Sequence, residues 1–511
     1  MSNVSISTGS VLFTGKKPSA SVADKNTPKA ERDGTPMHIA LVADFSGRGS
    51  RGETDLQGLA SRKAWQVDRD NFEELFSKFN VSVKLAVSKE ALRFSEFDEL
   101  HPDYLYENLA LFADLRSLRR RLNKKDHFAK AADEIQRWAH FTSENKKSTE
   151  AAEERAPIPL PTDMFDAILT GGDTSSYQDS PVGDIQSLIK DIVAPYVEPK
   201  ADPRLPEYLA AVDQATAQTL RRVLHADAYQ DLEAAWRCVD LMVRRIDTGN
   251  KLKLFLIDVS QDEIRQDLAS TNAIEETALY KRLVEQQQVS GSTPFGVINL
   301  DITLTDTEQD CRLASALSHI GEAANAAVVA GAATRIAGCE DISRTEDVDD
   351  WCYSPAAEFS REWQAMREQK AAAHLGLCAP RFLVRMPYGK RSSPIESFEF
   401  EELTQEQTHH YYLWANSAYL VTYLLAVSYS RSGWQLSSGL QPKVDELPLH
   451  IYTDDDESKA KACAEVYLRD RAAERLASCG ILSVRSVVNE AAVIIPNFRS
   501  VAADGSVLFD W

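Results

Sequence analysis

Cysteine is scarce in this 511-residue chain, and its spacing does not suit bridging or metal binding. The seven cysteines are scattered, odd in number and never two residues apart. Disulfide scaffolds and zinc sites need paired or closely spaced cysteines. The sequence therefore predicts neither, and it favours a reducing, cytoplasmic location.

Long apolar runs are also lacking. No segment approaches the roughly 20 apolar residues that cross a bilayer. The stretch from Met1 to Lys17 does not have a charged region followed by an apolar one, which a secretory signal requires. We therefore expect neither membrane insertion nor export by a signal peptide.

Positive charge is in short supply. The 57 Lys and Arg residues face 77 Asp and Glu residues, a formal net charge of -20. A general nucleic-acid binder needs a basic face, so this function class is not expected. The exception is the stretch from Arg116 to Lys125, interpreted as a solvated helix face. An electrostatic contact with an acidic neighbour is the alternative.

Catalytic signatures are missing as well. The chain has no G-x-S-x-G, no H-E-x-x-H, no supported S-x-x-K and no dinucleotide fingerprint. The Gly-rich turn from Phe45 to Gly52 lacks the spacing of a phosphate loop. His409 and His410 are adjacent, and neighbouring helical residues point about 100° apart, too far to share one ion. No catalytic residue, cofactor or metal site is predicted, and a nucleotide-binding enzyme stays only as a remote alternative.

The residues that are present predict an α/β fold with mixed sheets flanked by helices. Residues 1–36 are polar and turn-rich and are expected to form an extended N-terminal arm. In 37–140 a buried strand is expected at His38–Ala43, followed by a helix that Asp70 and Glu73 start as a capping box. Alternation from Val81 to Val87 predicts a strand.

Further helices and strands are expected on both sides of a linker. Pro102 suits the first residue of a helix that runs through Leu118. Residues 141–163 carry charges and alternating prolines, which predict an extended linker. In 164–511, the apolar periodicity predicts that Tyr208 to Ile246 is strongly helical and that Phe295–Leu300 is a buried strand.

The stretch 380–434 is predicted to be the centre of a packing unit. Phe382–Met386 is a short apolar run that a Pro-Tyr-Gly turn closes, which is typical of a buried strand. A helical stripe begins at Leu413 and reaches Val427 with apolar residues nearly all round. A helix of that kind belongs in a core.

These words resemble a known family. PRFLVRMPYG at 380–389, FEFEE at 398–402, YLWANSAY at 412–419 and LHADAYQDLEAAWR at 224–237 are similar to the large contractile-sheath subunit of the type VI secretion system. IALVADFSGR at 39–48 and VDRDNFEELF at 67–76 resemble the small sheath subunit. The resemblance implies small-subunit-like and large-subunit-like modules, 37–140 and 164–511, packed together in one chain.

The resemblance implies a structural protein rather than an enzyme. Its expected partners are other sheath or baseplate subunits, the inner-tube protein and a AAA+ unfoldase. Relative to the family, the large-subunit-like region is expected to be shortened at its C-terminus. That departure keeps a second hypothesis open: a sheath-like accessory protein, acting as baseplate adaptor, assembly initiator or end cap without polymerising.

Two segments are candidates for assembly contacts. The word GSVLF occurs at 9–13 and again at 505–509. If the repeat is not chance, each copy is a strand that can add to a neighbour's sheet edge. The candidate residues are Val11, Leu12, Phe13, Val507, Leu508 and Phe509. By the resemblance, Met164–Leu169 matches the helix that the unfoldase grips, through Phe165, Ile168 and Leu169; a short core helix is the alternative.

Overall fold

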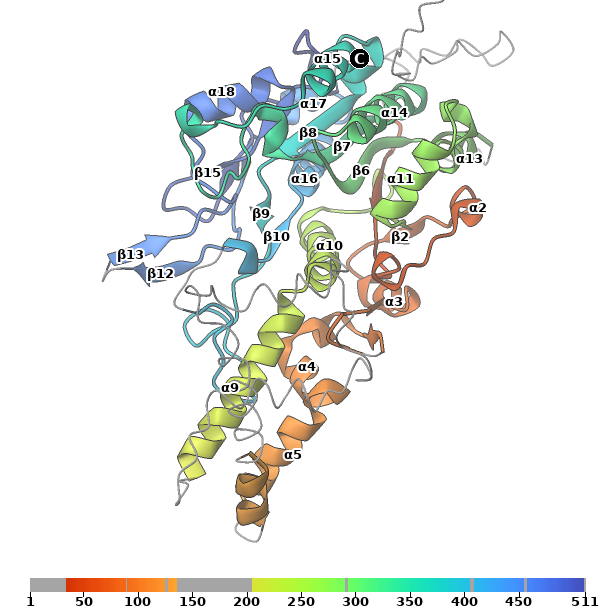
Figure 1. The fold of residues 1–511 in the computed structure, drawn as a ribbon. Helices are drawn as coiled ribbons and strands as arrows, with labels where there is room; N and C mark the ends of the chain where they lie inside the picture. The colour runs from red at the N-terminus through yellow and green to blue at the C-terminus, as the bar shows by residue number, and fades with distance from the viewer. Residues whose placement is uncertain are drawn as a thin grey trace, which may run out of the picture.

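A seven-stranded sheet is the centre of the computed structural model, which describes residues 34–88, 90–124, 127–135, 205–289, 293–404, 409–454 and 457–509. The strand order is β14-β8-β7-β6-β1-β5-β2 (Figure 1). All neighbours pair in parallel except β2, which is antiparallel to β5 at one edge. The strands are β1 (Met37–Ala43), β2 (Trp65–Val67), β5 (Leu252–Asp258), β6 (Phe295–Leu304), β7 (Ala327–Ala332), β8 (Leu375–Ala379) and β14 (Ile481–Ser483).

Helices cover both faces of this sheet. One face packs against α3 (Phe72–Lys78), α10 (Asp227–Arg245), α16 (Ala418–Ser432) and α17 (Leu436–Gly439). The other packs against α2 (Leu56–Leu59), α11 (Gln261–Ser270), α12 (Ala278–Tyr280), α14 (Glu308–Ala324), α15 (Ala357–Arg367) and α18 (Asp470–Ser478). A parallel strand buried on both faces reads as a continuous apolar run. This is why Ile39 to Val42 are all fully buried although they belong to two separate cores.

A helical arm extends away from the sheet. It contains α4 (Pro102–Asn108), α5 (Ala113–Leu122), helical residues 127–135 and α9 (Leu205–Leu224). Figure 1 shows α5 and α9 running side by side toward the lower end of the view. An ion pair of 2.6 Å between Arg119 Nε and Asp213 Oδ1 joins these two helices.

Small sheets and a short helix complete the described residues. They are β3 (Ser82–Val83) with β4 (Leu92–Arg93), β9 (Phe382–Leu383) with β10 (Trp414–Ala415), β12 (Ile451–Asp454) with β13 (Glu457–Ala460), the group β11 (Lys443–Val444), β16 (Val493–Ile494) and β15 (Arg485–Ser486), and α13 (Gln286–Val289). No helix among the described residues is long and apolar enough to cross a membrane.

Several predictions from the sequence are confirmed. The fold is mixed α/β, with a mainly parallel sheet between helices. Pro102 is the first residue of α4. The strand at His38–Ala43 is β1, and the strand at Phe295–Leu300 is β6, which continues to Leu304.

Two local predictions in the first part of the chain are wrong. The N-cap of α3 is Asn71, and Asp70 with Glu73 forms no capping box, because Glu73 instead accepts a hydrogen bond from the Phe97 N–H. A strand was expected from Val81 to Val87, but only Ser82–Val83 forms one. Its alternating apolar residues are buried by the helices around them rather than by a long sheet partner.

The helical stretch predicted from Tyr208 to Ile246 is confirmed as α9 and α10. Two other helices are shorter than predicted, and the one expected from Pro102 to Leu118 is divided into α4 and α5. The helix expected from Leu413 begins only at Ala418, because Trp414–Ala415 pairs with β9 as a strand. The strand expected at Phe382–Met386 keeps only its first two residues. An apolar period shows that residues are buried. The residues where these helices are interrupted are also partly buried, so the period does not reveal the interruption.

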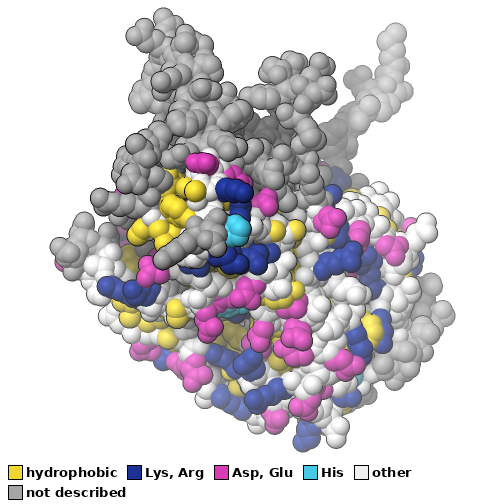
Figure 2. Space-filling view, turned by 90° about the horizontal axis from the view of Figure 1, so that it is seen from below, with side chains coloured by type: hydrophobic (Ala, Val, Ile, Leu, Met, Phe, Trp, Pro, Cys, Tyr) yellow, Lys and Arg dark blue, Asp and Glu magenta, His cyan; other side chains and the backbone are white. Residues whose placement is uncertain are grey.

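Two arginines of the basic stretch in α5 are paired with acidic residues of the same chain. Arg119 pairs with Asp213, and Arg121 pairs with Glu134 at 2.8 Å. Arg116 donates to the carbonyl oxygen of Leu109 at 3.0 Å. Figure 2 shows Lys and Arg side chains interspersed with Asp and Glu side chains on the face seen from below. Arg120 and Lys124 of the same stretch stay exposed, so part of it remains a solvated, positively charged face.

Candidate functional site

The contact between residues 34–135 and residues 205–509 is the most elaborate interaction surface in the described chain. We call these the N-terminal and C-terminal segments. Strand β1 of the N-terminal segment lies between β5 and β6 of the C-terminal segment: Leu41 is level with Leu256 on one side and with Asn299 on the other. An interior strand has both rows of its backbone hydrogen-bonding groups satisfied by neighbours. The sheet is therefore incomplete without both segments.

An aromatic cluster joins the segments beside the sheet. Trp236 in α10 is fully buried among Phe45, Phe72, Phe76 and Phe79 of the N-terminal segment. The four phenyl centroids lie 4.7 to 5.8 Å from the indole centroid, in tilted or edge-on arrangements. The Trp236 Nε1–H donates to the carbonyl oxygen of Phe45 at 2.8 Å. Offset and edge-on aromatic pairs add to the stabilisation that burial alone supplies.

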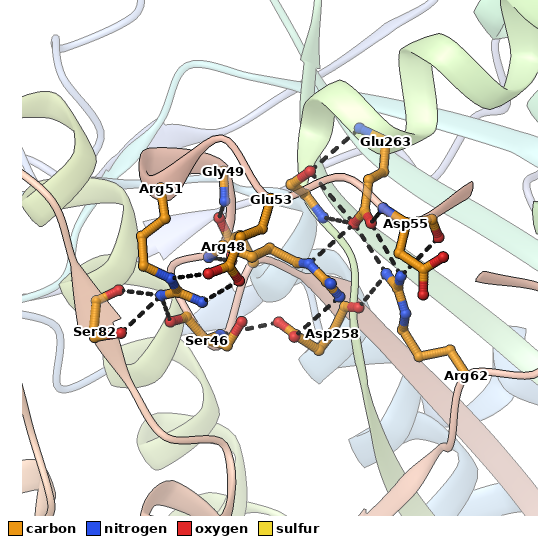
Figure 3. A network of polar contacts seen from close by, with 12 residues as sticks. Ser46, Arg48, Gly49, Arg51, Glu53, Asp55, Arg62, Ser82, Asp258 and Glu263 are labelled. Atoms are coloured by element: carbon orange, nitrogen blue, oxygen red, sulfur yellow. Dashed lines mark hydrogen bonds and ion pairs between the residues drawn. The ribbon is translucent and has the colours of Figure 1, made fainter. Parts of the chain in front are cut away.

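A polar network continues the contact at the carboxyl ends of β1 and β5 (Figure 3). Its centre is Glu263, whose side chain is fully buried and forms a capping box with Ser260 at the start of α11. Arg62 donates to both carboxylate oxygens at 2.9 and 3.0 Å, and the Asp55 N–H donates at 2.8 Å. Burial by itself raises the pKa of Glu263, but these hydrogen bonds outweigh it and hold the pKa below its ordinary value.

A second centre in Figure 3 is Arg51. Its Nη1 donates to the carbonyl oxygens of Ser46 and Ser82, at 2.7 and 2.6 Å, and its other nitrogens pair with Glu53. The Ser46 N–H donates to Asp258 Oδ1 at 2.9 Å, across to the end of β5. The loop that follows β1 is thereby attached to both segments by charged hydrogen bonds, which are the stronger class.

A buried ion network connects three of the sequence words described above. Arg385 of PRFLVRMPYG donates to Glu402 of FEFEE at 2.7 and 2.9 Å and to Glu233 of α10 at 2.8 Å. Glu233 also accepts from Arg237 at 2.7 Å. Burial raises the pKa of Glu402, but Arg385 and His225 outweigh it and lower the pKa to about 2. Three stretches that lie far apart in the sequence thus meet in one buried charged cluster.

A small acidic cavity lies at the carboxyl ends of β1, β5 and β6. It has a volume of about 160 Å³ and is lined by Gly47 and Gly49 of the Gly-rich turn and by carboxylates that include Asp44 and Asp301. Burial and the neighbouring Asp258 raise the pKa of Asp44 to about 6; burial raises that of Asp301 to about 6. Clustered carboxylates repel a phosphate group. Among the described residues, no group of His, Cys, Asp and Glu has the arrangement of a metal site.

Ionisation of Asp301 in this cavity should lower the stability of the folded chain. A raised pKa means that the folded chain binds the proton more tightly than the unfolded chain, so stability is lost as the pH rises through about 6. Asp301→Asn removes this penalty and keeps an acceptor for the Tyr419 hydroxyl. We expect the variant to gain up to about 3 kcal/mol in unfolding free energy at pH 8 and nothing at pH 4. Denaturant titration at both values measures it.

The control for that prediction is Asp262→Asn. Asp262 lies on the rim of the same cavity but is exposed, so we expect a change within about 0.5 kcal/mol at either pH. A gain for Asp301→Asn that is equal at pH 4 and pH 8 would contradict the ionisation argument.

The predicted assembly residues at the end of the chain are folded onto their own chain. Val507 forms an antiparallel bridge with Arg499. Leu508 is fully buried and lies over Gly376, where any added Cβ would come within 2.6 Å of its Cδ2. The Phe509 ring lies 6.4 Å from the Phe498 ring. The predicted residues Val11, Leu12, Phe13, Phe165, Ile168 and Leu169, and the linker 141–163, lie outside the described residues.

Comparison with known families accounts for both segments. The model of VipB (EvpB/VC_A0108, tail sheath N-terminal domain) matches residues 206–502. The chain belongs to the VipB tail sheath family. A second model, described as type VI secretion system, VipA, VC_A0107 or Hcp2, matches residues 24–137 of the same chain. The resemblance seen in the sequence is confirmed for both halves of this fused sheath protein.

A curated relative agrees with this family. The type VI secretion system sheath protein TssC1 of Pseudomonas aeruginosa is 28% identical over 284 residues, which is 54% of this chain and 56% of the relative. The chain thus spans about half the length of the relative that it matches. The sequence words of the family are now explained by contacts: Glu233, Arg385 and Glu402 are the buried ion network. No sequence pattern pointed to the Trp236 cluster, since its four phenylalanines come from a different segment.

The shared sheet predicts that the two segments hold together without a covalent link. We expect that a protease site inserted within 141–163 and then cleaved leaves both fragments in one complex, because β1 is paired on both sides. Size-exclusion chromatography before and after cleavage, followed by a denaturing gel, tests this. Elution of the smaller fragment by itself under native conditions would contradict it.

Proposed function

We propose that this chain is a structural component of a type VI secretion-like contractile apparatus, in which a fused small and large sheath subunit forms the sheath or docks on it. The observation that carries the proposal is the presence of both sheath families in one chain, built into one sheet with β1 between β5 and β6. Fusion supplies both halves in equal number and at high effective concentration. The role is mechanical, with no bond made or broken.

Several finer parts of the proposal concern partners. Other sheath or baseplate subunits and the inner-tube protein are the proposed neighbours, in the cytoplasm. Contacts between copies would use the strand segments Val11–Phe13 and Val507–Phe509, and a AAA+ unfoldase would grip Phe165, Ile168 and Leu169. Main-chain pairing at a sheet edge gives affinity with little demand on sequence.

A nucleotide-dependent enzyme is the less favoured function for the Gly-rich turn. The cavity beside Gly47 and Gly49 is lined by carboxylates, whereas a phosphate needs backbone N–H groups and cations. The Arg48 and Gly49 N–H groups are already occupied by Asp44, at 2.8 and 2.7 Å. Calorimetry with ATP and GTP should record no binding heat.

One observation favours the accessory role as the second candidate. Val507 and Leu508 are engaged within their own chain, so exchange with a neighbour requires their release. A protein that docks on a sheath without extending it, as a baseplate adaptor, initiator or end cap, needs no such release.

Negative-stain electron microscopy of the purified chain, alone and with the inner-tube protein, separates these roles. Long tubes support the polymerising sheath subunit. Discrete particles that bind to the ends of preformed sheaths support the accessory role. Particles that associate with neither inner tube nor sheath would contradict the proposed function.

A further inference from the structure

A projecting β-hairpin depends on its two roots for its orientation. Strands β12 and β13 form a separate two-stranded sheet that extends to one side of the molecule (Figure 1). Ile451 in β12 is 60% exposed, so little apolar burial holds the hairpin. An isolated two-stranded hairpin is only marginally stable in water. The side chains that flank it, His450 and Lys461, therefore contribute to how it is held, beside the Tyr467 hydroxyl, which donates to the Ala460 carbonyl oxygen at 3.2 Å.

Both roots are bound by the same segment of the chain. The Tyr412 hydroxyl lies 2.9 Å from His450 Nδ1 at the first root. At the second root, Lys461 Nζ lies 3.1 Å from His409 Nδ1. His409 is in the 3-10 turn His409–Tyr411, and its ring stacks on the Trp414 indole at 4.8 Å. The two anchors, His409 and Tyr412, thus lie on one short stretch just before β10.

The contacts of His409 define where its proton is. A lysine ammonium group is only a donor, so His409 Nδ1 must accept and carries no hydrogen. The hydrogen of the neutral ring is then on Nε2, which donates to Glu465 Oε1 at 3.0 Å. Glu465 is buried and is fixed by Arg381, whose Nη2 lies 2.8 Å from the same oxygen. The ring is held in one tautomer between Lys461 and Glu465.

We propose that His409 is a proton-sensitive latch for the β12–β13 hairpin. Uptake of a proton at Nδ1 turns the acceptor into a donor, which cannot coexist with the ammonium group of Lys461 at 3.1 Å. Lys461 then leaves the ring, and the second root is loosened, held by the Tyr467 hydroxyl on the Ala460 carbonyl oxygen at 3.2 Å and by the Lys461 N–H on the His450 carbonyl oxygen at 2.8 Å. The first root persists, because the Tyr412 hydroxyl can accept from a protonated His450 as readily as it donates to a neutral one.

The charges around His409 set the pH range. Burial, together with the positive Lys461 and Arg381, lowers the pKa of His409, and Glu465 raises it; the net shift is downward. Asp341 lies further off, and the His410 ring is 5.8 Å away. Because the folded chain binds this proton less tightly than the unfolded chain, the stabilisation is complete above the ordinary histidine pKa and is lost as the pH falls below it.

Hydrogen exchange of the hairpin amides tests the latch in the full-length chain. After correction for intrinsic rates, we expect peptides covering 451–460 to exchange at least about threefold faster at pH 5.5 than at pH 7.5. His409→Gln, which cannot titrate, should remove this difference. His410→Gln is the matched control: the neighbouring ring is exposed and does not contact Lys461, so the wild-type pH dependence should remain.

A second variant keeps the test decisive if His409→Gln does not fold. Lys461→Met removes the ammonium group, so the hairpin should exchange rapidly at both pH values. Equal corrected rates for the wild type at pH 5.5 and 7.5 would overturn the proposal. So would an unchanged pH dependence in either His409→Gln or Lys461→Met.

Discussion

Replacing Trp236 with Ala is expected to lower the unfolding free energy by about 3–5 kcal/mol, the cost of emptying a large aromatic site in a core. The indole is fully buried, and its removal leaves the four phenyl rings around it without their common partner. The lost hydrogen bond from Nε1 leaves the Phe45 carbonyl oxygen unpaired, which adds to the cost. Guanidinium unfolding followed by far-UV circular dichroism measures the effect.

Two comparisons make that result specific. Trp236→Phe loses the hydrogen bond but keeps an aromatic ring, so it should cost clearly less than Ala. Trp351→Ala is the control, because Trp351 is only partly buried and its Nε1 has no hydrogen-bond partner; about 1 kcal/mol is expected. Equal losses for Trp236→Ala and Trp351→Ala would show that the cluster does not hold the segments together.

Arg385→Met is expected to cost about 3–5 kcal/mol, the loss seen when one member of a buried ion pair is removed. Glu402 and Glu233 are fully buried, and the variant leaves the Glu402 carboxylate with the Tyr388 N–H at 2.7 Å and the more distant His225 ring at 3.6 Å. Uptake of a proton by Glu402 removes its uncompensated charge in the variant, so the deficit should shrink as the pH falls toward 4. Thermal and denaturant unfolding at pH 7.5 and pH 4.5 give both values.

The exposed pair between Arg471 and Asp349 supplies the control. The Arg471 guanidinium lies 2.7 Å from the Asp349 carboxylate, but both side chains are about two-thirds exposed, at 67% and 66%. Arg471→Met should therefore change stability far less than Arg385→Met, because water screens an exposed ion pair. If Arg385→Met lowered stability as little as Arg471→Met, the ion network would not be needed for stability. The presence of Arg385 in PRFLVRMPYG and of Glu402 in FEFEE would then need another explanation.

Two acidic residues with the same capping pattern behave differently in this fold. The Ser260–Glu263 pair forms a capping box, whereas Asp70–Glu73 has the same spacing and does not. Glu73 instead accepts a hydrogen bond from the Phe97 N–H, which belongs to a later turn of the chain. A capping pattern states what a pair can do locally, and tertiary contacts decide whether it does so.

The stretch around His409 shows the same limit. For the two adjacent histidines the sequence predicted only that they do not share a metal ion. His409 is half-buried between Lys461 and Glu465, more than fifty positions later in the chain. No periodicity or spacing rule links residues at such a distance, so the sequence could not predict the contacts of His409 with Lys461 and Glu465.

What the amino-acid sequence determined by itself was composition, the local elements and the family. Runs such as Ile39–Val42 are apolar at every position, and that alone indicates a strand buried on both faces. What only the tertiary structure decided was which strands lie beside each other: β1 is inserted between β5 and β6, more than two hundred residues later. An apolar pattern records that a residue is buried, but the free energy of burial is nearly the same against any apolar partner. The partners were therefore chosen by sheet order, ring geometry and paired charges, which exist only once the chain has folded.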